Sequence, residues 1–349
     1  MAERFLDLER GDRADILQSL AVQLGRTAVA LEMDVWVCWT LGTLFALPGR
    51  EAMAFKGGTS LSKVYGAIAR FSEDIDITID CRGLVEPFDP FDTAATVTAQ
   101  KRYGQRLVAA MARHVREVVS PWMAAEMARQ FHGTCQIELD ADPEKMWVRY
   151  ESALPPSLGY LERRVLVEFG GRNSLEPSET RTVESYLCGQ VEGVEFPVAR
   201  VDVLRPERTF WEKATLIHAE CGKGEITSSR ERLSRHWYDL GRLADHDIGR
   251  RALADRALLV DVVKFKKVFF RAGYANYDAC CTGELRLVPD PGMLSGLRAD
   301  FAQMLGSGMF EGHPPVFDQV MERLRQLEWQ INTPSEERPV VPFPEDLKT

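Results

Sequence analysis

The sequence lacks any apolar segment long enough to cross a membrane. Its longest early apolar run, residues 35–49, is uncharged but only about 15 residues long, whereas a membrane-spanning helix needs ~20. The first residues also lack the basic segment followed by an apolar segment that marks a secretory signal. We therefore expect a cytoplasmic protein with no membrane association.

The spacing of cysteine and histidine excludes further classes of protein. The chain has seven cysteines, an odd number, and no C-x-x-C pair, which argues against both a disulfide framework and a zinc ribbon. A metal site of His218, Cys221 and His236 is conceivable, but the first two lie on or beside an apolar helix face, where packing explains them better. No H-E-x-x-H motif is present, so zinc-dependent hydrolases are not supported.

The charge balance does not favour non-specific binding to nucleic acid. The formal net charge is −9, which disfavours such binding over the whole surface. Two segments could still form local basic patches, although ordinary solvated helix faces explain them equally well. The first contains Lys101, Arg102, Arg106, Arg113 and Arg116, and the second contains Arg230, Arg232, Arg235, Arg242, Arg250 and Arg251.

Length and hydrophobic patterning indicate two domains. A chain of 349 residues with 45% apolar and 27% charged residues can bury a full core. Helical periodicity covers residues 16–24 and 34–45, and residues 98–131 indicate two helices with a break near Pro121. Strands are expected at residues 53–55, 74–80, 134–139, 146–150, 163–169 and 198–204.

The pattern changes after residue 204. Pro206 suits the first turn of a helix, and helical periodicity then dominates to about residue 327. We therefore expect an α/β (α+β) domain with a mixed sheet over residues 1–204 and a mainly α-helical domain over residues 205–332. Residues 333–349 are rich in Pro and Glu and are expected to form a tail.

The most informative segment is F-K-G-G-T-S-L-S at residues 55–62, where a glycine turn separates a short strand from a predicted helix over residues 59–69. A helix N-terminus presents backbone N–H groups that bind phosphate, so Lys56, Gly57, Gly58, Thr59 and Ser60 are candidate triphosphate-binding residues. A Walker P-loop is excluded because its lysine follows the glycines, whereas Lys56 precedes them. Taken alone, the glycine pair is also consistent with a simple tight turn.

Acidic residues downstream of this turn could hold metal ions. In residues 74–80 three isoleucines alternate with Asp74, Asp76, Thr78 and Asp80, and residues i and i+2 of a strand project from one face about 6.6 Å apart. Asp74 and Asp76 can thus ligate Mg²⁺ ions about 4 Å apart, with Mn²⁺ as a substitute. Glu168, flanked by apolar residues in a predicted strand, is the candidate third ligand. Solvated strand faces also carry acids, but the glycine turn upstream favours the metal site.

Blocks at several points of the chain occur in the order of a known family. They are residues 56–65 (KGGTSLSKVY), 70–77 (RFSEDIDI), 32–37 (EMDVWV), 205–214 (RPERTFWEKA) and 235–239 (RHWYD). Together they resemble the AbiEii/AbiGii abortive-infection nucleotidyltransferases, which are MenT-like toxins of the DNA polymerase β-like superfamily. One departure is Met33, where relatives carry lysine.

The resemblance implies a nucleotidyltransferase core over residues 1–204, tRNA acceptor ends as the acceptor, and a cognate antitoxin as partner. It also assigns Lys213 to the triphosphate and Asp239 to the active site, as a base, a metal-shell group or a positioning residue. The residues alone also allow simpler explanations. Lys213 could extend from the edge of an apolar helix face to water, and Asp239 could form an i,i+4 ion pair with Arg235.

We therefore expect a Mg²⁺-dependent enzyme that transfers a nucleoside monophosphate from a nucleoside triphosphate to RNA, foremost to the 3′ end of tRNA, and releases pyrophosphate. Asp74, Asp76 and Glu168 would hold the metal, and Lys213 would neutralise the triphosphate. A second hypothesis keeps this chemistry but uses a protein hydroxyl as acceptor, giving nucleotidylylation (AMPylation). A third is a non-catalytic nucleotide- or RNA-binding regulator, which the presence of all three acids disfavours.

Overall fold

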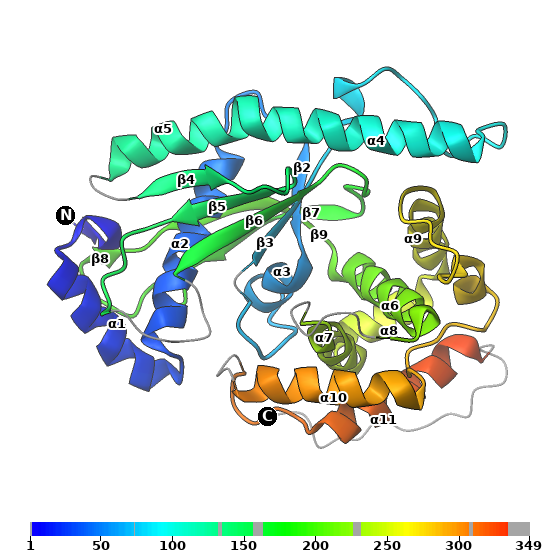
Figure 1. Ribbon diagram of the computed structural model, residues 1–349. Coiled ribbons are helices and arrows are strands. Elements are labelled where there is room, and N and C mark those ends of the chain that lie inside the picture. The colour runs from blue at the N-terminus through cyan, green and yellow to red at the C-terminus, as the bar shows by residue number, and fades with distance from the viewer. Residues whose placement is uncertain are drawn as a thin grey trace.

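The computed structural model describes residues 2–72, 74–131, 135–155, 163–225, 232–306 and 310–333 (Figure 1). A mixed β-sheet with its covering helices forms one part of the molecule, and a group of helices forms the other. The expected α/β core followed by helices is confirmed. The predicted tail beyond Thr333, Arg230 of the second basic segment and residue 134 of a predicted strand lie outside the described residues.

The central sheet has seven strands in the order β4-β5-β6-β3-β2-β9-β7. They are β2 (Met53–Lys56), β3 (Asp74–Ile79), β4 (Gln136–Leu139), β5 (Lys145–Arg149), β6 (Arg164–Gly170), β7 (Ser178–Glu184) and β9 (Val198–Leu204). Strands β2 and β3 are antiparallel, whereas β3 pairs with β6, and β2 with β9, in parallel. A separate parallel pair joins β1 (Glu3–Arg4) to β8 (Val194–Glu195). The acidic strand β3 therefore lies in the middle of the sheet.

The helices lie on both sides of this sheet. They are α1 (Arg10–Leu24), α2 (Ala28–Phe45), α3 (Gly57–Lys63), α4 (Val97–His114), α5 (Ser120–Gln130), α6 (Pro206–Lys223), α7 (Ser234–Asp245), α8 (Asp247–Ala254), α9 (Arg256–Phe269), α10 (Pro291–Gly306) and α11 (Phe317–Asn332). Figure 1 shows α4 and α5 running along one side of the sheet, while α6 to α11 gather on the other.

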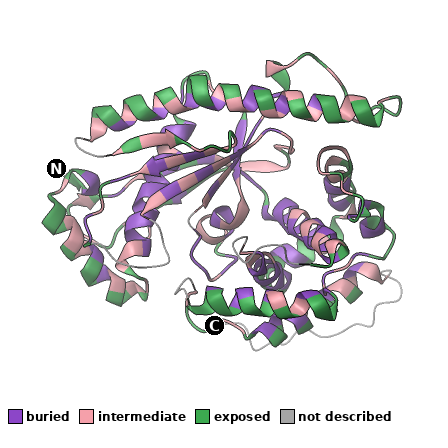
Figure 2. Ribbon diagram, in the orientation of Figure 1, coloured by how far each residue is buried: buried purple, intermediate pink, exposed green. Residues whose placement is uncertain are grey.

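One face of the sheet is buried against α2, α4 and α5. The isoleucines of β3 are buried in a core that they share with Trp36 of α2 and Met111 of α4. Figure 2 shows the buried residues concentrated in the sheet and in the helix segments that face it. Because side chains alternate along a strand, the opposite face of β3 carries Asp74 and Asp76. The hydrophobic core therefore sets which face of β3 is acidic.

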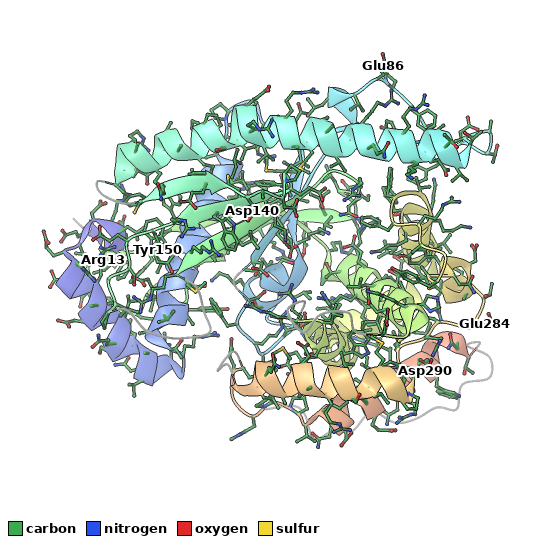
Figure 3. All side chains as sticks on the ribbon, viewed as in Figure 1. Arg13, Glu86, Asp140, Tyr150, Glu284 and Asp290 are labelled. Carbon is green, nitrogen blue, oxygen red and sulfur yellow. The ribbon has the colours of Figure 1, made fainter. Side chains whose placement is uncertain are left out.

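Aromatic rings close this core at the end nearest α1. Trp36 stacks on Tyr150 with ring centroids 4.9 Å apart, and the ring of Phe131 meets Trp36 edge-on at 5.0 Å. Tyr150 is labelled in Figure 3, where Glu86 and Glu284 reach outward from the surface. Both glutamates are exposed, as charged side chains without a buried partner should be.

Helix α2 is longer than predicted and carries buried charges. It begins at Ala28, because the Thr27 side chain accepts a hydrogen bond from the backbone N–H of Ala30 and caps the helix. By length and composition alone α2 could cross a membrane, yet 78% of it is buried inside the protein. Its Glu32 and Asp34 are also buried, and each has polar partners within the protein. Packing against the sheet accounts for the apolar composition of α2.

Two further helical segments differ from the sequence-based prediction. No break occurs at Pro121: α4 continues through a π-helical segment (Val115–Val119) into α5, and Pro121 occupies the first turn of α5. The wider π-helical turn accommodates the proline ring, which has no N–H to pair. The predicted helix over residues 59–69 is shorter and is α3, which ends at Lys63. The left-handed Gly66 (φ +57°) lies in the segment that returns the chain towards β3.

The helices after β9 enclose a second hydrophobic core, in which Trp237 and Leu324 are almost fully buried. Helix α6 begins at Pro206, as the sequence predicts. Three residues that follow the glycine turn also belong to this core, namely Leu61, Ala67 and Ile68. The segment that carries the glycine turn therefore packs on the helical part, while the domain boundary near residue 204 stays a prediction.

Replacing Asp34 by Ala is expected to destabilise the protein strongly. The side chains of Asp34 and Lys63 are only 1% and 4% exposed and form an ion pair between α2 and α3, so the substitution leaves a buried ammonium group without its partner. An unpaired buried charge of this kind costs about 3–5 kcal/mol, which urea unfolding measures. The double variant Asp34→Leu with Lys63→Met removes both charges and should recover most of that loss. A double variant as unstable as the single one would contradict the assignment.

Candidate active site

Four charged residues form a row across neighbouring strands. Asp76 of β3 lies opposite Glu168 of β6 on one side and opposite Lys56 of β2 on the other. Lys145 of β5 lies opposite Glu168. Neighbouring strands are about 4.8 Å apart, so the row from Lys145 to Lys56 spans about 14 Å. Asp74 projects from the same face two residues before Asp76, and the sheet therefore brings the three predicted acids together.

Asp76 has the most perturbed carboxyl group of this row. Burial raises the pKa of Asp76 to about 6, and the negative charges of Glu168 and Asp74 add to the rise. The positive charges of Lys56 and Arg235 act in the opposite direction. At neutral pH Asp76 is an ionised carboxylate held beside two others, an arrangement that a divalent cation would stabilise.

Two of the three acids already pair with cations of the protein. Glu168 Oε1 lies 2.9 Å from Lys145 Nζ, and Asp74 Oδ2 lies 3.1 Å from Arg235 Nη1. Among the described residues, no three His, Cys, Asp or Glu side chains form a ready-made metal site. Carboxylate oxygens suit hard cations such as Mg²⁺ and Mn²⁺, so the donor set fits such an ion.

The glycine turn lies directly against Asp76. Gly57 has a left-handed backbone (φ +80°), and a Cβ added there would lie 1.9 Å from Asp76 Oδ2. At Gly58, a Cβ would lie 2.8 Å from both Arg70 Nη2 and Ser72 Oγ. Both positions therefore need glycine because of close approach, and Gly57 needs it for its backbone conformation as well. The turn brings the N-terminus of α3 against the acidic strand.

The hydroxyl groups of Thr59 and Ser60 are used within the turn. Thr59 Oγ1 donates to the backbone carbonyls of Ser72 and Asp74, and Ser60 Oγ donates to the carbonyl of Gly57 at 2.9 Å. Both residues are fully buried. Both hydroxyl groups are therefore already hydrogen-bonded within the protein. What the turn keeps for a phosphate is the backbone N–H groups at the start of α3, which have no partners within the helix.

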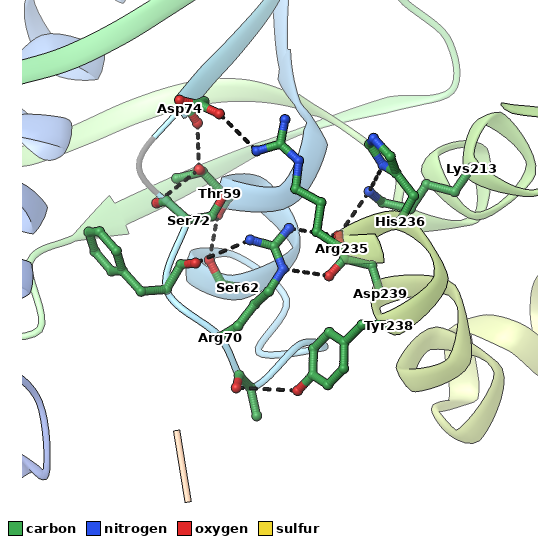
Figure 4. A network of polar contacts seen from close by, with 12 residues as sticks. Thr59, Ser62, Arg70, Ser72, Asp74, Lys213, Arg235, His236, Tyr238 and Asp239 are labelled. Carbon is green, nitrogen blue, oxygen red and sulfur yellow. Dashed lines mark hydrogen bonds and ion pairs between the residues drawn. The ribbon is translucent and has the colours of Figure 1, made fainter. Parts of the chain in front are cut away.

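A buried network of ion pairs connects the glycine turn and the acidic strand to α6 and α7 (Figure 4). Asp239 of α7 is fully buried and accepts two hydrogen bonds from Arg70, at 2.7 and 2.8 Å. Lys213 of α6 lies 2.9 Å from the same carboxylate. Arg235 of α7 reaches Asp74 on β3. The helical part is thus joined by charges to the segment that carries the predicted metal ligands.

The protonation states of Asp239, Lys213 and His236 depend on burial and on the charges of their neighbours. Burial raises the pKa of Asp239, but the positive charges of Arg70 and Lys213 outweigh it and hold that pKa well below its usual range. Burial lowers the pKa of Lys213, and Asp239 opposes this effect. Burial and the neighbouring Lys213 and Arg235 lower the pKa of His236, whose Nδ1 lies 3.4 Å from Lys213 Nζ. A neutral His236 ring can therefore accept a hydrogen bond from Lys213.

Both alternative explanations for Lys213 and Asp239 are wrong. Lys213 is buried and does not reach water. The described ion pairs of Asp239 are with Arg70 and Lys213, whereas Arg235, its predicted partner, reaches Asp74. The positions of Lys213 and Asp239 agree with the active-site assignment that the family resemblance implied, while their roles stay predictions.

The metal cluster considered from the sequence is not formed within the described residues. His218 Nδ1 accepts a hydrogen bond from the backbone N–H of Arg286 at 3.0 Å, and Cys221 is buried in the helical core. All seven cysteines are free thiols, as their spacing predicts. Packing is therefore the role of His218 and Cys221.

The sequence analysis missed Arg70 and gave Arg235 no role at the site. Each arginine is the first residue of a family block, 70–77 or 235–239, but neither belongs to a hydrophobic period. The one available signal for Arg70 was its position at the start of the block 70–77, just before the acidic strand. Its partner Asp239 lies 169 residues further along the chain, so their bidentate ion pair is visible only in the folded protein.

The Gly57→Ala variant is expected to lose more stability than a change of backbone conformation alone explains. Its new methyl group collides with Asp76, in addition to the roughly 1–2 kcal/mol that a left-handed non-glycine residue costs. Gly49→Ala is the matched control, because Gly49 is also left-handed (φ +62°) but its Cβ would meet nothing within 4 Å. Urea unfolding of both variants measures the difference. Equal losses would mean that close approach to Asp76 is unimportant.

Asp76→Asn is expected to raise the melting temperature of the metal-free protein at pH 7.5. The folded protein raises the pKa of Asp76 from about 3.9 to about 6, so its ionised form costs stability, and this cost grows as the pH rises through that interval. Added Mg²⁺ should raise the melting temperature of the wild type but not of the variant.

The control for this variant is Asp202→Asn on β9, where the carboxylate pairs with Arg50 at 3.2 Å. The same chemical change should give no stabilisation there, because it removes an attraction instead of a repulsion. A metal-free Asp76→Asn protein that melts at or below the wild-type temperature would contradict the described charge arrangement.

Comparison with known proteins identifies the family of the chain. The sequence-family model for the nucleotidyl transferase AbiEii toxins of type IV toxin–antitoxin systems matches residues 39–323 of the chain. This range contains every residue of the site. No curated protein sequence matches the chain. Among solved structures, it is similar to the nucleotidyltransferase toxin MenT4 from Mycobacterium tuberculosis H37Rv, with a TM-score of 0.49 and 18% identity over 94% of this chain and 91% of that chain. The family match extends over most of the chain and confirms the resemblance, and the protein belongs to the AbiEii family of nucleotidyltransferase toxins of type IV toxin–antitoxin systems.

Proposed function

We propose that this nucleotidyltransferase moves a nucleoside monophosphate from a nucleoside triphosphate to an RNA hydroxyl, with the 3′ end of tRNA as the acceptor. The acceptor hydroxyl attacks the α-phosphorus, the bond between that phosphorus and the oxygen bridging to the β-phosphate breaks, and pyrophosphate leaves. The hydroxyl proton passes to solvent. The observation that carries the proposal is the convergence of Asp74, Asp76 and Glu168 on one face of the sheet, against the glycine turn.

In this proposal Asp74, Asp76 and Glu168 hold Mg²⁺, with Mn²⁺ as a substitute. When bound, such ions polarise the attacking and leaving oxygens of an in-line displacement. The fit rests on the oxygen donors and on the like charges that raise the pKa of Asp76. Ion binding would free Arg235 and Lys145 from Asp74 and Glu168, which leaves both cations available to the phosphates or to the RNA backbone.

The remaining site residues position the triphosphate. Backbone N–H groups of Gly57, Gly58, Thr59 and Ser60 face the phosphates at the start of α3, and Lys56 flanks the acids. Lys213 supplies positive charge to the phosphates. Its ammonium group is held in place by Asp239, so Asp239 acts as a positioning residue.

The proposal places the enzyme in the cytoplasm, where triphosphates and tRNA are found, with a cognate antitoxin that restrains it. The mixed-sheet domain carries the acids and the glycine turn, and the helical domain contributes Lys213 and Asp239. From the two basic segments noted in the sequence, Arg102 on α4 and Arg250 on α8 are exposed and are candidate contacts for an RNA backbone.

Transfer should be lost in the Asp76→Ala variant. The protein is incubated with Mg²⁺, each labelled triphosphate in turn, and either total tRNA or cell protein, and label retained on each acceptor is counted. We expect label on tRNA with wild type and a loss of at least about a thousandfold with Asp76→Ala, because several kcal/mol of transition-state stabilisation disappear.

Asp245→Ala is the control for this assay. Asp245 lies on the same helix as Asp239 but pairs with Arg323 at the surface, so its removal should leave transfer intact. Label on protein instead of RNA would select the nucleotidylylation hypothesis. Triphosphate binding without transfer to either acceptor would overturn the proposal and favour a non-catalytic regulator.

A further inference from the structure

Helices α4 and α9 lie side by side near the carboxyl end of β6 (Figure 1). A groove of about 580 Å³ lies between them. This volume falls within the range of about 300–1,000 Å³ that is usual for ligand pockets. Its described lining contains none of the residues placed in the active site above. The lining of this α4–α9 groove includes Lys101 and Gly104 of α4, Phe269 of α9, and Arg271, Arg172 and Pro143.

The described lining of the groove is cationic. It contains Lys101, Arg172 and Arg271 but no acid, although the chain as a whole has a formal net charge of −9. Within the residues that the structure describes, Lys101 and Arg271 form no ion pair. The groove therefore differs in charge from the chain as a whole.

The acids nearest to the lining in the chain flank Pro143 and already have partners. Glu144 pairs with Arg172 at 3.2 Å and offsets the charge of that guanidinium. Asp142 is exposed and lies 3.9 Å from Lys145. The charges of the other two cations of the lining are therefore available to an anionic ligand.

The guanidinium group of Arg271 is held in place before any ligand binds. Its Nη2 donates to Gln100 Oε1 on α4 at 3.3 Å, and its Nε donates to the backbone carbonyl of Lys267 at 3.2 Å. Gln100 is itself fixed, because its Nε2 donates to the carbonyl of Pro90 at 2.8 Å. A guanidinium group has five N–H donors, so these two bonds leave others for a phosphate oxygen.

Gly104 leaves space for a ligand beside an aromatic ring. A Cβ at this position would meet only the half-buried ring of Phe269, at 3.5 Å, which is an ordinary contact. Glycine weakens the interior of a helix relative to alanine, and packing does not require it here. An aromatic ring beside cations suits a nucleotide, whose base contacts the ring while its phosphate meets the positive charge.

The groove is close enough to the acids for one nucleic-acid strand to reach both. Arg172 follows Glu168 by four residues, so their Cα atoms are at most about 14 Å apart. A stacked strand rises roughly 3.4 Å per nucleotide, and about four nucleotides cover that distance. A strand that ends at the acids could therefore have an upstream nucleotide in the groove.

We propose that the α4–α9 groove binds a single-stranded segment of the acceptor RNA, upstream of the hydroxyl group that reacts. The proposal rests on the proposed function and adds to it a second contact region for the acceptor. Lys101 and Arg271 bind phosphates of the strand, and a base occupies the space beside Phe269. An RNA strand fits better than an acidic peptide, because the acceptor strand has to end at the nearby acids.

The test is fluorescence anisotropy with a labelled ten-nucleotide single-stranded RNA of mixed sequence, in Mg²⁺ and without triphosphate. For a single strand, each lost phosphate contact lowers the slope of log affinity against log salt by about 0.7, which is about fivefold in affinity at 0.1 M salt. Lys101→Gln and Arg271→Gln should each show this loss, and Arg271→Lys should restore the slope. Gly104→Met should weaken binding without changing the slope, because it fills the groove and keeps its charge.

Arg113→Gln is the matched control, since Arg113 is exposed on the same helix but lies outside the described lining. It should bind the RNA as wild type does. Four results would each overturn the proposal: no binding by wild type, unchanged affinity in Lys101→Gln and Arg271→Gln, an equal loss in Arg113→Gln, or displacement of the RNA by hexaglutamate as effective as by unlabelled RNA.

The transfer assay separates the groove from the proposed function. Lys101→Gln and Arg271→Gln should raise KM for the RNA acceptor by about fivefold and leave KM for the triphosphate unchanged. If RNA binding depends on the groove but wild type transfers no nucleotide, the proposed function fails and the groove stands. If wild type transfers nucleotide to RNA and both variants keep its affinity and KM for RNA, the function stands and the groove fails.

Discussion

The register of β3 between β2 and β6 is the constraint on which the site depends. In this register Asp76 lies between Lys56 and Glu168, and the isoleucines of β3 point into the core. A shift by one residue would bury the aspartates and expose the isoleucines. Burying an isoleucine side chain contributes about 1.5–3 kcal/mol, so three of them hold the strand in place against the mutual repulsion of the acids. Hydrophobic packing on one face thus makes an acidic face tolerable on the other.

Cations from separate elements offset the remaining repulsion. Lys145 of β5 pairs with Glu168, and Arg235 of α7 pairs with Asp74. Helix α7 is itself joined to the glycine-turn segment by the bidentate pair of Arg70 and Asp239, in which both partners are almost completely buried. Such a pair adds little net stability but specifies one arrangement, because a break would leave a buried charge unpaired. The sheet and the helical part therefore meet in one geometry at the acids.

Much of the site could be predicted because its signals are local. The alternation of residues 74–80 gives a strand with one acidic face, and the apolar flanks of Glu168 indicate a neighbouring strand. The glycine turn was recognisable because a glycine pair separates a short predicted strand from a predicted helix. The hydroxyl partners of Thr59 and Ser60 could not be predicted, because the chain returns to β3 after a shorter helix than the periodicity suggested. Pro121 was predicted to mark a break because proline usually ends a helix. In the structure a π-helical turn precedes the proline and the helix continues.

Residue order and the periods of strand and helix were enough to predict the acidic strand, the glycine turn, the α/β core followed by helices, and the family. Which charges form pairs is visible only in the folded protein. The pairs of Arg70 with Asp239 and of Arg235 with Asp74 connect residues that are 169 and 161 positions apart in the sequence. The backbone geometry of a strand or helix repeats every few residues, so apolar residues recur in the sequence with the same period. A charge pair between distant elements depends on how whole elements pack, and no period in the sequence records it.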